Sequence, residues 1–136
     1  MKNLILIILG FFTAINISAQ CDSIATFCEH NLSRDYISDG QIHRVLLFND
    51  QVAEFETTLF GGNTYRIAAC SGAEDGNLVF RIFDQEKNQL FSNAEFSNAP
   101  YWDFVVENTI HCIIEAQLDL HRKESGCAVI LIGFKQ

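Results

Sequence analysis

The feature that most constrains the fold of this chain is a series of short runs in which apolar and polar residues alternate. We expect strands at residues 41–48, 52–59, 64–70, 77–84, 89–92, 101–106, 109–118 and 127–134. Successive side chains of a strand point to opposite faces of a sheet, so such alternation indicates strands with one buried face. The last run is apolar on both faces and is predicted as a central strand. A series of short strands at this spacing predicts an all-β sandwich.

The stretch LFGGNTYRIAACSG, residues 59–72, indicates how two of these runs are joined. Gly61 and Gly62 stand between alternating runs, where a turn needs residues that tolerate a positive φ. A glycine pair can also cradle a phosphate, but the phosphate loop is then followed by a helix whose amides point at the ligand. Here a strand-like run follows, so we interpret the pair as a turn.

The first 19 residues have the layout of a secretory signal peptide. Lys2 precedes an apolar run, and the small residues Ser18 and Ala19 follow it. The apolar run has about 14 residues, fewer than the roughly 20 that a membrane-spanning helix needs. We therefore expect cleavage after Ala19, export to the periplasm or beyond it, and no membrane span.

Cys21 raises the alternative of a lipoprotein, because a lipidated cysteine follows a short box of small residues. Gln20 occupies the position before it, where such a box carries Gly, Ala or Ser. Export without a lipid anchor fits the sequence better.

Residues 20–136 have the length of one domain and can bury a core of their own. Near its start, residues 22–32 carry apolar side chains at helical spacing. The sequence therefore predicts a short amphipathic helix there, with its apolar side formed by Ile24, Phe27, Cys28 and Leu32.

The charge of the chain limits its partners. The sequence has 9 Lys and Arg against 17 Asp and Glu, a net charge of −8. Binding to nucleic acid draws most of its affinity from cationic side chains that neutralise phosphates. Docking on anionic lipid has the same requirement. We expect neither kind of partner, and we interpret the acidity as a source of solubility.

All the cysteines lie after the signal peptide, where export permits disulfides. They are Cys21, Cys28, Cys70, Cys112 and Cys127, and the odd number leaves one thiol over. Metal binding is the alternative, but no two cysteines have the C-x2-C spacing of a zinc site. We expect structural disulfides and no metal or cofactor.

Geometry removes two of the conceivable pairs. Cys21 and Cys28 are too far apart on one helix to bond. Cys112 and Cys127 fall on consecutive strands, and regular pairing of those strands would keep them apart. Two kinds of bridge stay open: one from the N-terminal segment to the sheet, and one from Cys70 to Cys112 or Cys127.

Three segments in order resemble the bacterial pre-peptidase C-terminal domain: EFETTLFGGNTYRIAACSG, DGNLVFRIFDQEKNQL and a strand pair ending CAVILIGF. The resemblance covers roughly residues 50–134, and the positions that correspond are Gly62, Tyr65, Asp75, Asp84 and Asn88. It implies a jelly-roll-like sandwich of a kind often appended to secreted peptidases. The chain departs from the family in its cysteines and in TIHCIIEAQ, which replaces the usual G-x-Y-Y-x-x-V strand. The signal ending SAQ is also similar to that of small secreted proteins of Bacteroidetes-type bacteria, a likeness that implies no activity.

Catalytic motifs are missing from the sequence. No histidine lies in His-Glu-x-x-His, and no serine lies in Gly-x-Ser-x-Gly. His111 and Cys112 are neighbours, but adjacent residues of a strand point to opposite faces and cannot act together. We predict that the protein is not an enzyme and that its histidines are solvated at the surface: His30, His43, His111 and His121.

Acidic residues at two turns suggest calcium as an alternative. Glu74 and Asp75 lie in one turn and Asp84 in another. Calcium takes about six to eight oxygen ligands, so three carboxylates in separate loops give little support to a site. We interpret them as solvated turn residues.

The densest aromatic segment near a turn is SNAPYWDF, residues 97–104. If Trp102 faces the core, Tyr101 faces outward beside Asn98, and an exposed aromatic with a neighbouring amide is a common way to bind protein or glycan. We favour the simpler interpretation, in which both rings cover one end of the core. The sequence thus predicts an exported, non-catalytic binding or structural module with Asn98 and Tyr101 as candidate ligand contacts. A small inhibitor or accessory factor of an exported enzyme is the alternative function.

Overall fold

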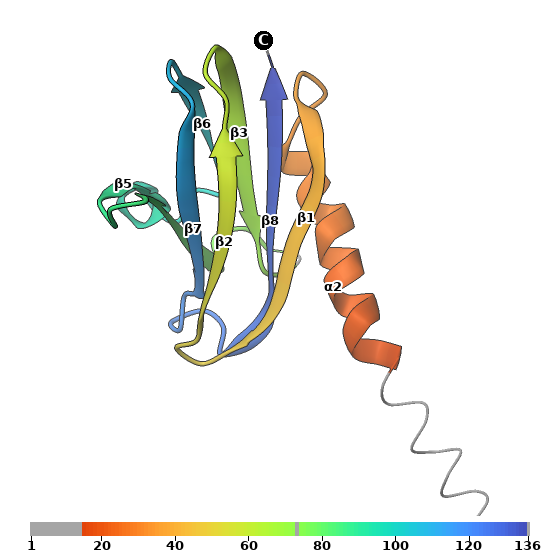
Figure 1. The fold of residues 1–136 in the computed structure, drawn as a ribbon. Helices are drawn as coiled ribbons and strands as arrows, with labels where there is room; N and C mark the ends of the chain where they lie inside the picture. Colours follow the sequence, from red (N-terminus) through yellow and green to blue (C-terminus); the bar gives the residue numbers. More distant parts are fainter. Residues whose placement is uncertain (1–14, 73, 136) are drawn as a thin grey trace, which may run out of the picture.

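A computed structural model describes residues 15–72 and 74–135 of the chain, in which eight strands follow one helix (Figure 1). The elements are α2 (Ile15–Cys28), the 3-10 helix η1 (Glu29–Asn31), β1 (Ile37–Phe48), β2 (Val52–Leu59), β3 (Asn63–Cys70), β4 (Leu78–Asp84), β5 (Gln89–Ser92), the 3-10 helix η2 (Asn93–Phe96), β6 (Tyr101–Val106), β7 (Ile110–Leu118) and β8 (Ser125–Lys135). The helix begins within the predicted signal peptide, and residues 1–14 of that peptide lie outside the described residues. No helix in the described part of the chain is long and apolar enough to cross a membrane.

The strands form two antiparallel sheets of four. We call β1-β8-β3-β6 the helix-side sheet and β2-β7-β4-β5 the second sheet. β1 pairs with β8, β2 with β7, β3 with β6 and β4 with β5, so the chain is one long hairpin wrapped into two layers. That is the strand order of a jelly roll, and it confirms the predicted fold class.

The wrapping corrects one expectation about neighbouring strands. β7 and β8 lie in different sheets, so the regular pairing expected between them is wrong. The turn at Gly61 and Gly62 is confirmed, with Gly62 at φ +88°, and it carries the chain from the second sheet to the helix-side sheet. Alternation reveals which face of a strand is buried, but it contains no information on which strand lies beside it.

The main core lies between the two sheets and is built from the inward residues that alternation predicts. Its members on β3, β4, β7 and β8 include Ile67, Phe80, Ile114, Ile130 and Ile132, each at most 1% exposed. β8 lies between β1 and β3 and is buried on both faces, as its sequence predicts.

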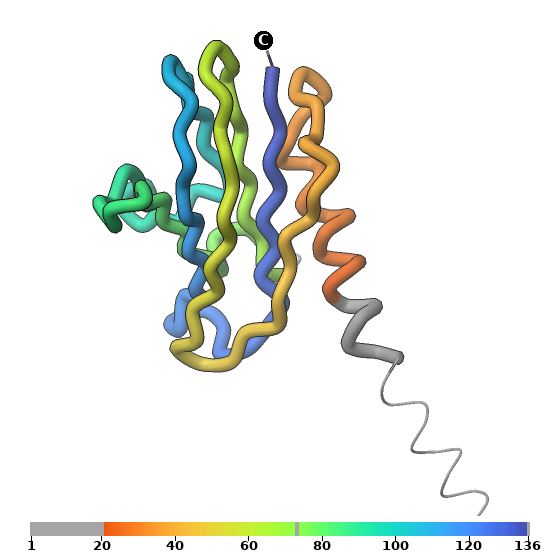
Figure 2. The backbone as a smooth tube through the Cα atoms, viewed as in Figure 1, coloured from red at the N-terminus to blue at the C-terminus, as the bar shows by residue number. Residues whose placement is uncertain are grey.

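A second core explains why β8 and β3 are buried on both faces. Helix α2 packs across the outer face of the helix-side sheet, as Figures 1 and 2 show. Its apolar residues enclose the outward side chains of the two strands, in a cluster of Ala25, Cys28, Leu32, Ala68, Cys70, Val129 and Leu131. The amphipathic helix expected at residues 22–32 is thus α2 continued by η1, whose tighter turns are common at helix ends.

Two disulfides fasten the helix to this sheet. Cys21 bonds Cys127 and Cys28 bonds Cys70, with Cα separations of 5.4 and 5.8 Å. Both bridges are of the first kind left open above, from the N-terminal segment to the sheet. Cys70 therefore does not bond Cys112 or Cys127, and Cys112 is the free thiol, buried in the main core.

Candidate binding site

Tyr101, a predicted ligand contact, lies at the start of β6 with its ring against the guanidinium of Arg66. The Cζ atom of Arg66 lies 4.1 Å from the centroid of the Tyr101 ring and 4.6 Å from that of the Tyr36 ring. Arg66 also donates two hydrogen bonds to the Asp103 carboxylate, of 2.7 and 2.9 Å. These bonds lower the pKa of Asp103 and raise that of Arg66. Tyr101 thus belongs to a cluster of ionic and stacking contacts, and it is 38% exposed.

Asn98, the other predicted contact, holds loops together. Its backbone is left-handed, with φ of 53°. Its amide nitrogen donates to the carbonyl of Gly76 at 3.1 Å and to the Asp119 carboxylate at 2.8 Å. Asn98 and Tyr101 therefore have different bonding partners, and their role in binding a ligand stays a prediction.

The three carboxylates considered as calcium ligands lie at two separate turns of the chain. Asp84, at the end of β4, accepts hydrogen bonds from the backbone N–H groups of Glu86 and Asn88 and from the Asn88 side chain. The bonds from Asn88 lower the pKa of the Asp84 carboxyl. Glu74 and Asp75 lie before the start of β4. Within the described ranges, no three His, Cys, Asp or Glu residues are grouped so as to hold a metal ion.

One histidine departs from the expected exposure. His43 is half-buried, its ring centroid lies 5.1 Å from that of Phe55, and its Nε2 atom is buried without a hydrogen-bond partner among the described residues. The prediction of a solvated side chain is wrong here because His43 stands opposite Ile130 in register and faces the sandwich interior. His111 is exposed, whereas the next residue, Cys112, is 3% exposed.

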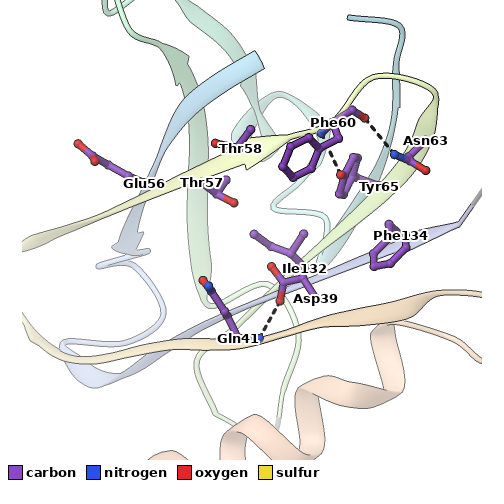
Figure 3. A pocket seen from close by; sticks show the side chains of 10 residues that line it. All are labelled: Asp39, Gln41, Glu56, Thr57, Thr58, Phe60, Asn63, Tyr65, Ile132 and Phe134. Atoms are coloured by element: carbon purple, nitrogen blue, oxygen red, sulfur yellow. Dashed lines mark hydrogen bonds between the residues drawn. The ribbon is translucent and has the colours of Figure 1, made fainter. Parts of the chain in front are cut away.

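A groove opens between β1 and β2, the edge strands of the two sheets (Figure 3). Its volume is about 660 Å³, in the range typical of ligand sites. The floor is apolar, formed by Tyr65, Ile132 and Phe134, and polar side chains of β1 and β2 line its walls.

The rim of the groove carries an exposed aromatic residue. Phe60 follows the last residue of β2 and is 59% exposed. Its N–H donates to the Tyr65 hydroxyl at 2.9 Å, and its carbonyl accepts from the Asn63 side chain at 3.2 Å. Figure 3 shows both bonds.

The next two residues fix the same loop against the rest of the sandwich. The Gly61 N–H donates to the Thr109 hydroxyl at 3.0 Å, and the Gly62 N–H donates to the Val106 carbonyl at 2.8 Å. A Cβ on Gly61 would lie only 2.6 Å from the Glu107 carbonyl oxygen, so the close approach of two backbones requires glycine there. The loop therefore presents Phe60 from a rigid support.

The electrostatic character of the groove is negative. Its lining, as far as the described residues form it, contains the carboxylates of Asp39 and Glu56 and has no Lys, Arg or His. Figure 3 shows Asp39 and Gln41 directed toward the floor and Glu56 at the end of the groove, pointing away from it. One Asp39 oxygen accepts from the Gln41 N–H at 2.9 Å.

Sequence reasoning missed this site, although one local signal for it existed. Phe60 is a large apolar residue next to a glycine turn, and it directly follows Leu59, the last inward residue of the alternating run. It therefore stands at an outward position, where the run otherwise has polar residues. Such a residue cannot join the core through the strand's inward face and is a candidate for exposure. The remaining walls come from strands that are distant in sequence, and no local pattern joins them.

No family model matches the chain, and no curated protein matches its sequence. The resemblance to the pre-peptidase C-terminal domain stays a prediction. Among solved structures, the chain is similar to PliG of Aeromonas hydrophila, a periplasmic lysozyme inhibitor of g-type lysozyme. The likeness has a TM-score of 0.54 at 10% sequence identity and covers 76% of this chain and 90% of PliG. At this identity, the two proteins share a fold.

Proposed function

We propose that the protein is an exported, non-catalytic inhibitor of an exported enzyme, and that a g-type lysozyme is the first target to test. The observation that carries the proposal is the fold shared with a periplasmic inhibitor over most of both chains. It favours the inhibitor among the functions expected from the sequence, ahead of a structural or glycan-binding module.

The surface is suited to binding a protein. Tight inhibitors usually bind with little change of shape, because a preorganised surface loses less entropy on binding. The loop that presents Phe60 is held by hydrogen bonds to β3, to β6 and to Thr109, the residue before β7. An exposed aromatic on a rigid loop is typical of the residues that dominate binding energy at interfaces.

Export is supported by the disulfides, which form and persist outside the reducing cytosol. We include in the proposal that the chain has no lipid anchor. A lipid on Cys21 would occupy the sulfur that bonds Cys127, so the anchored protein would lack that bridge.

Mass spectrometry of the protein exported by a bacterial host, without reductant, tests this part. We expect a chain that starts at Gln20, lacks four hydrogens through its two disulfides, and carries no lipid. A thiol reagent at pH 8 should not label the native protein, because burial raises the pKa of the Cys112 thiol to about 11. After unfolding it should label Cys112 alone, because the other cysteines are in disulfides. A lipid adduct on Cys21, or rapid labelling of the native protein, would contradict it.

Calorimetric titration of the disulfide-intact protein into a g-type lysozyme tests the function. We expect a one-to-one complex, and an affinity that falls as salt is raised if the partner's surface is positive, because the net charge of this chain is −8. Phe60→Ala should weaken binding at least tenfold, and Leu90→Ala, which also truncates a side chain about half exposed, serves as the matched control. Absence of heat and of complex at micromolar concentrations would exclude this target.

A further inference from the structure

The groove between β1 and β2 has a composition that suits one kind of occupant. Its floor is apolar, its charged lining residues are both acidic, and the whole chain is acidic. An anionic ligand would meet Asp39 with no cationic side chain among the described lining residues to offset it. A purely apolar ligand would bury the Asp39 carboxylate and Gln41 amide without adequate partners, at a cost in free energy.

A basic side chain satisfies both parts of the lining. Lys and Arg carry apolar stems that pack along hydrophobic surface while the charged head reaches a polar partner. Here the stem can lie along Phe134, which is half-buried, and the head can reach Asp39. One oxygen of Asp39 is used by the Gln41 N–H, and the other has no partner among the described residues. Phe134 and the exposed ring of Phe60 add aromatic surface that attracts a cation.

We propose that the groove binds a basic side chain, Arg or Lys, presented by a loop of the protein partner, with Phe60 packing beside that loop. This inference rests on the proposed function and adds to it the chemistry of the partner. Charge complementarity with the groove favours a cationic segment of a protein as its occupant.

A pair of variants isolates the charge of the groove. Asp39→Asn with Glu56→Gln removes both carboxylates, and the amide oxygen introduced at position 39 can still accept from the Gln41 N–H. The matched control is Asp50→Asn with Glu95→Gln, which also removes two negative charges, but at exposed positions outside the groove. All four substitutions are on the surface, so both proteins should fold with nearly unchanged stability.

The probe is the blocked tripeptide acetyl-Gly-Arg-Gly-amide, compared with its citrulline analogue, which has the same shape without the charge. We expect the arginine peptide to shift backbone amide NMR signals of β1, β2 and β8 around the groove at millimolar concentrations. The citrulline peptide should bind at least fivefold more weakly. The groove variant should lose the shifts, and the control variant should keep them.

Equal shifts with both peptides, shifts unaffected by the groove variant, or shifts elsewhere on the surface would overturn the inference. These outcomes do not involve a lysozyme, so they are distinguishable from failure of the proposed function. In the lysozyme titration, the groove variant should bind at least tenfold more weakly than the control variant. A groove that binds arginine in a protein that does not bind lysozyme would contradict the choice of target alone.

Discussion

Replacing Asn93 by alanine is expected to lower the free energy of unfolding by about 4 kcal/mol, because it leaves buried backbone groups without hydrogen bonds. Asn93 is fully buried. Its carbonyl oxygen accepts from the Phe80 N–H at 2.8 Å, and its amide nitrogen donates to the carbonyls of Leu78 and Ala99 at 3.0 and 3.1 Å. One side chain thus joins β4 of the second sheet to the loop that enters β6 of the helix-side sheet.

Urea denaturation of the variant and the natural protein measures this effect. Asn108→Ala is the matched control, because Asn108 is exposed and its truncation should change stability by less than about 0.5 kcal/mol. A loss below about 1 kcal/mol for Asn93→Ala would mean that water or a shifted backbone satisfies the same groups.

The Cys28–Cys70 disulfide is expected to make a contribution of similar size. The bridge links residues 42 positions apart, and the chain-entropy treatment of a loop of that length gives about 4 kcal/mol. It lies under the helix, with Cys28 0% and Cys70 3% exposed. The double variant Cys28→Ala, Cys70→Ala should therefore lose about 4 kcal/mol of unfolding free energy and expose α2 to hydrogen exchange.

Reduction of the natural protein measures the combined effect of the two disulfides. It breaks both bridges, so the reduced protein should be less stable than the oxidised double variant, which keeps Cys21–Cys127. If the double variant unfolded within about 1 kcal/mol of the natural protein, the packing of α2 and the remaining Cys21–Cys127 bridge would be enough to hold the helix on the sheet.

Local pattern was sufficient to locate the strands. The bounds of β2, β5 and β6 agree with the alternating runs at residues 52–59, 89–92 and 101–106. β1 is longer than predicted and begins at Ile37, because it continues across an irregularity between Ser38 and Ile42. The turn-like letters SDG mark that irregularity, and a bulge and a true turn have similar composition.

The sequence could not predict which residues far apart along the chain become neighbours in the fold. The disulfide partners depend on where α2 lies on the helix-side sheet, and this packing is not encoded in any local period. For the same reason, the contact residues predicted from the sequence are not the residues that line the groove. Asn98 and Tyr101 were chosen from one segment rich in aromatics, whereas Asp39, Phe60 and Phe134 become neighbours only after the hairpin is wrapped.

An inhibition titration is the direct test of the proposal that this sandwich inhibits an exported enzyme. A g-type lysozyme at a fixed concentration, acting on bacterial cell wall, would be mixed with increasing amounts of the disulfide-intact protein. We expect lysozyme activity to fall linearly to zero near one equivalent, and Phe60→Ala to shift the curve to at least tenfold higher concentration. Full activity at a large excess of the natural protein would contradict the claim for this enzyme class.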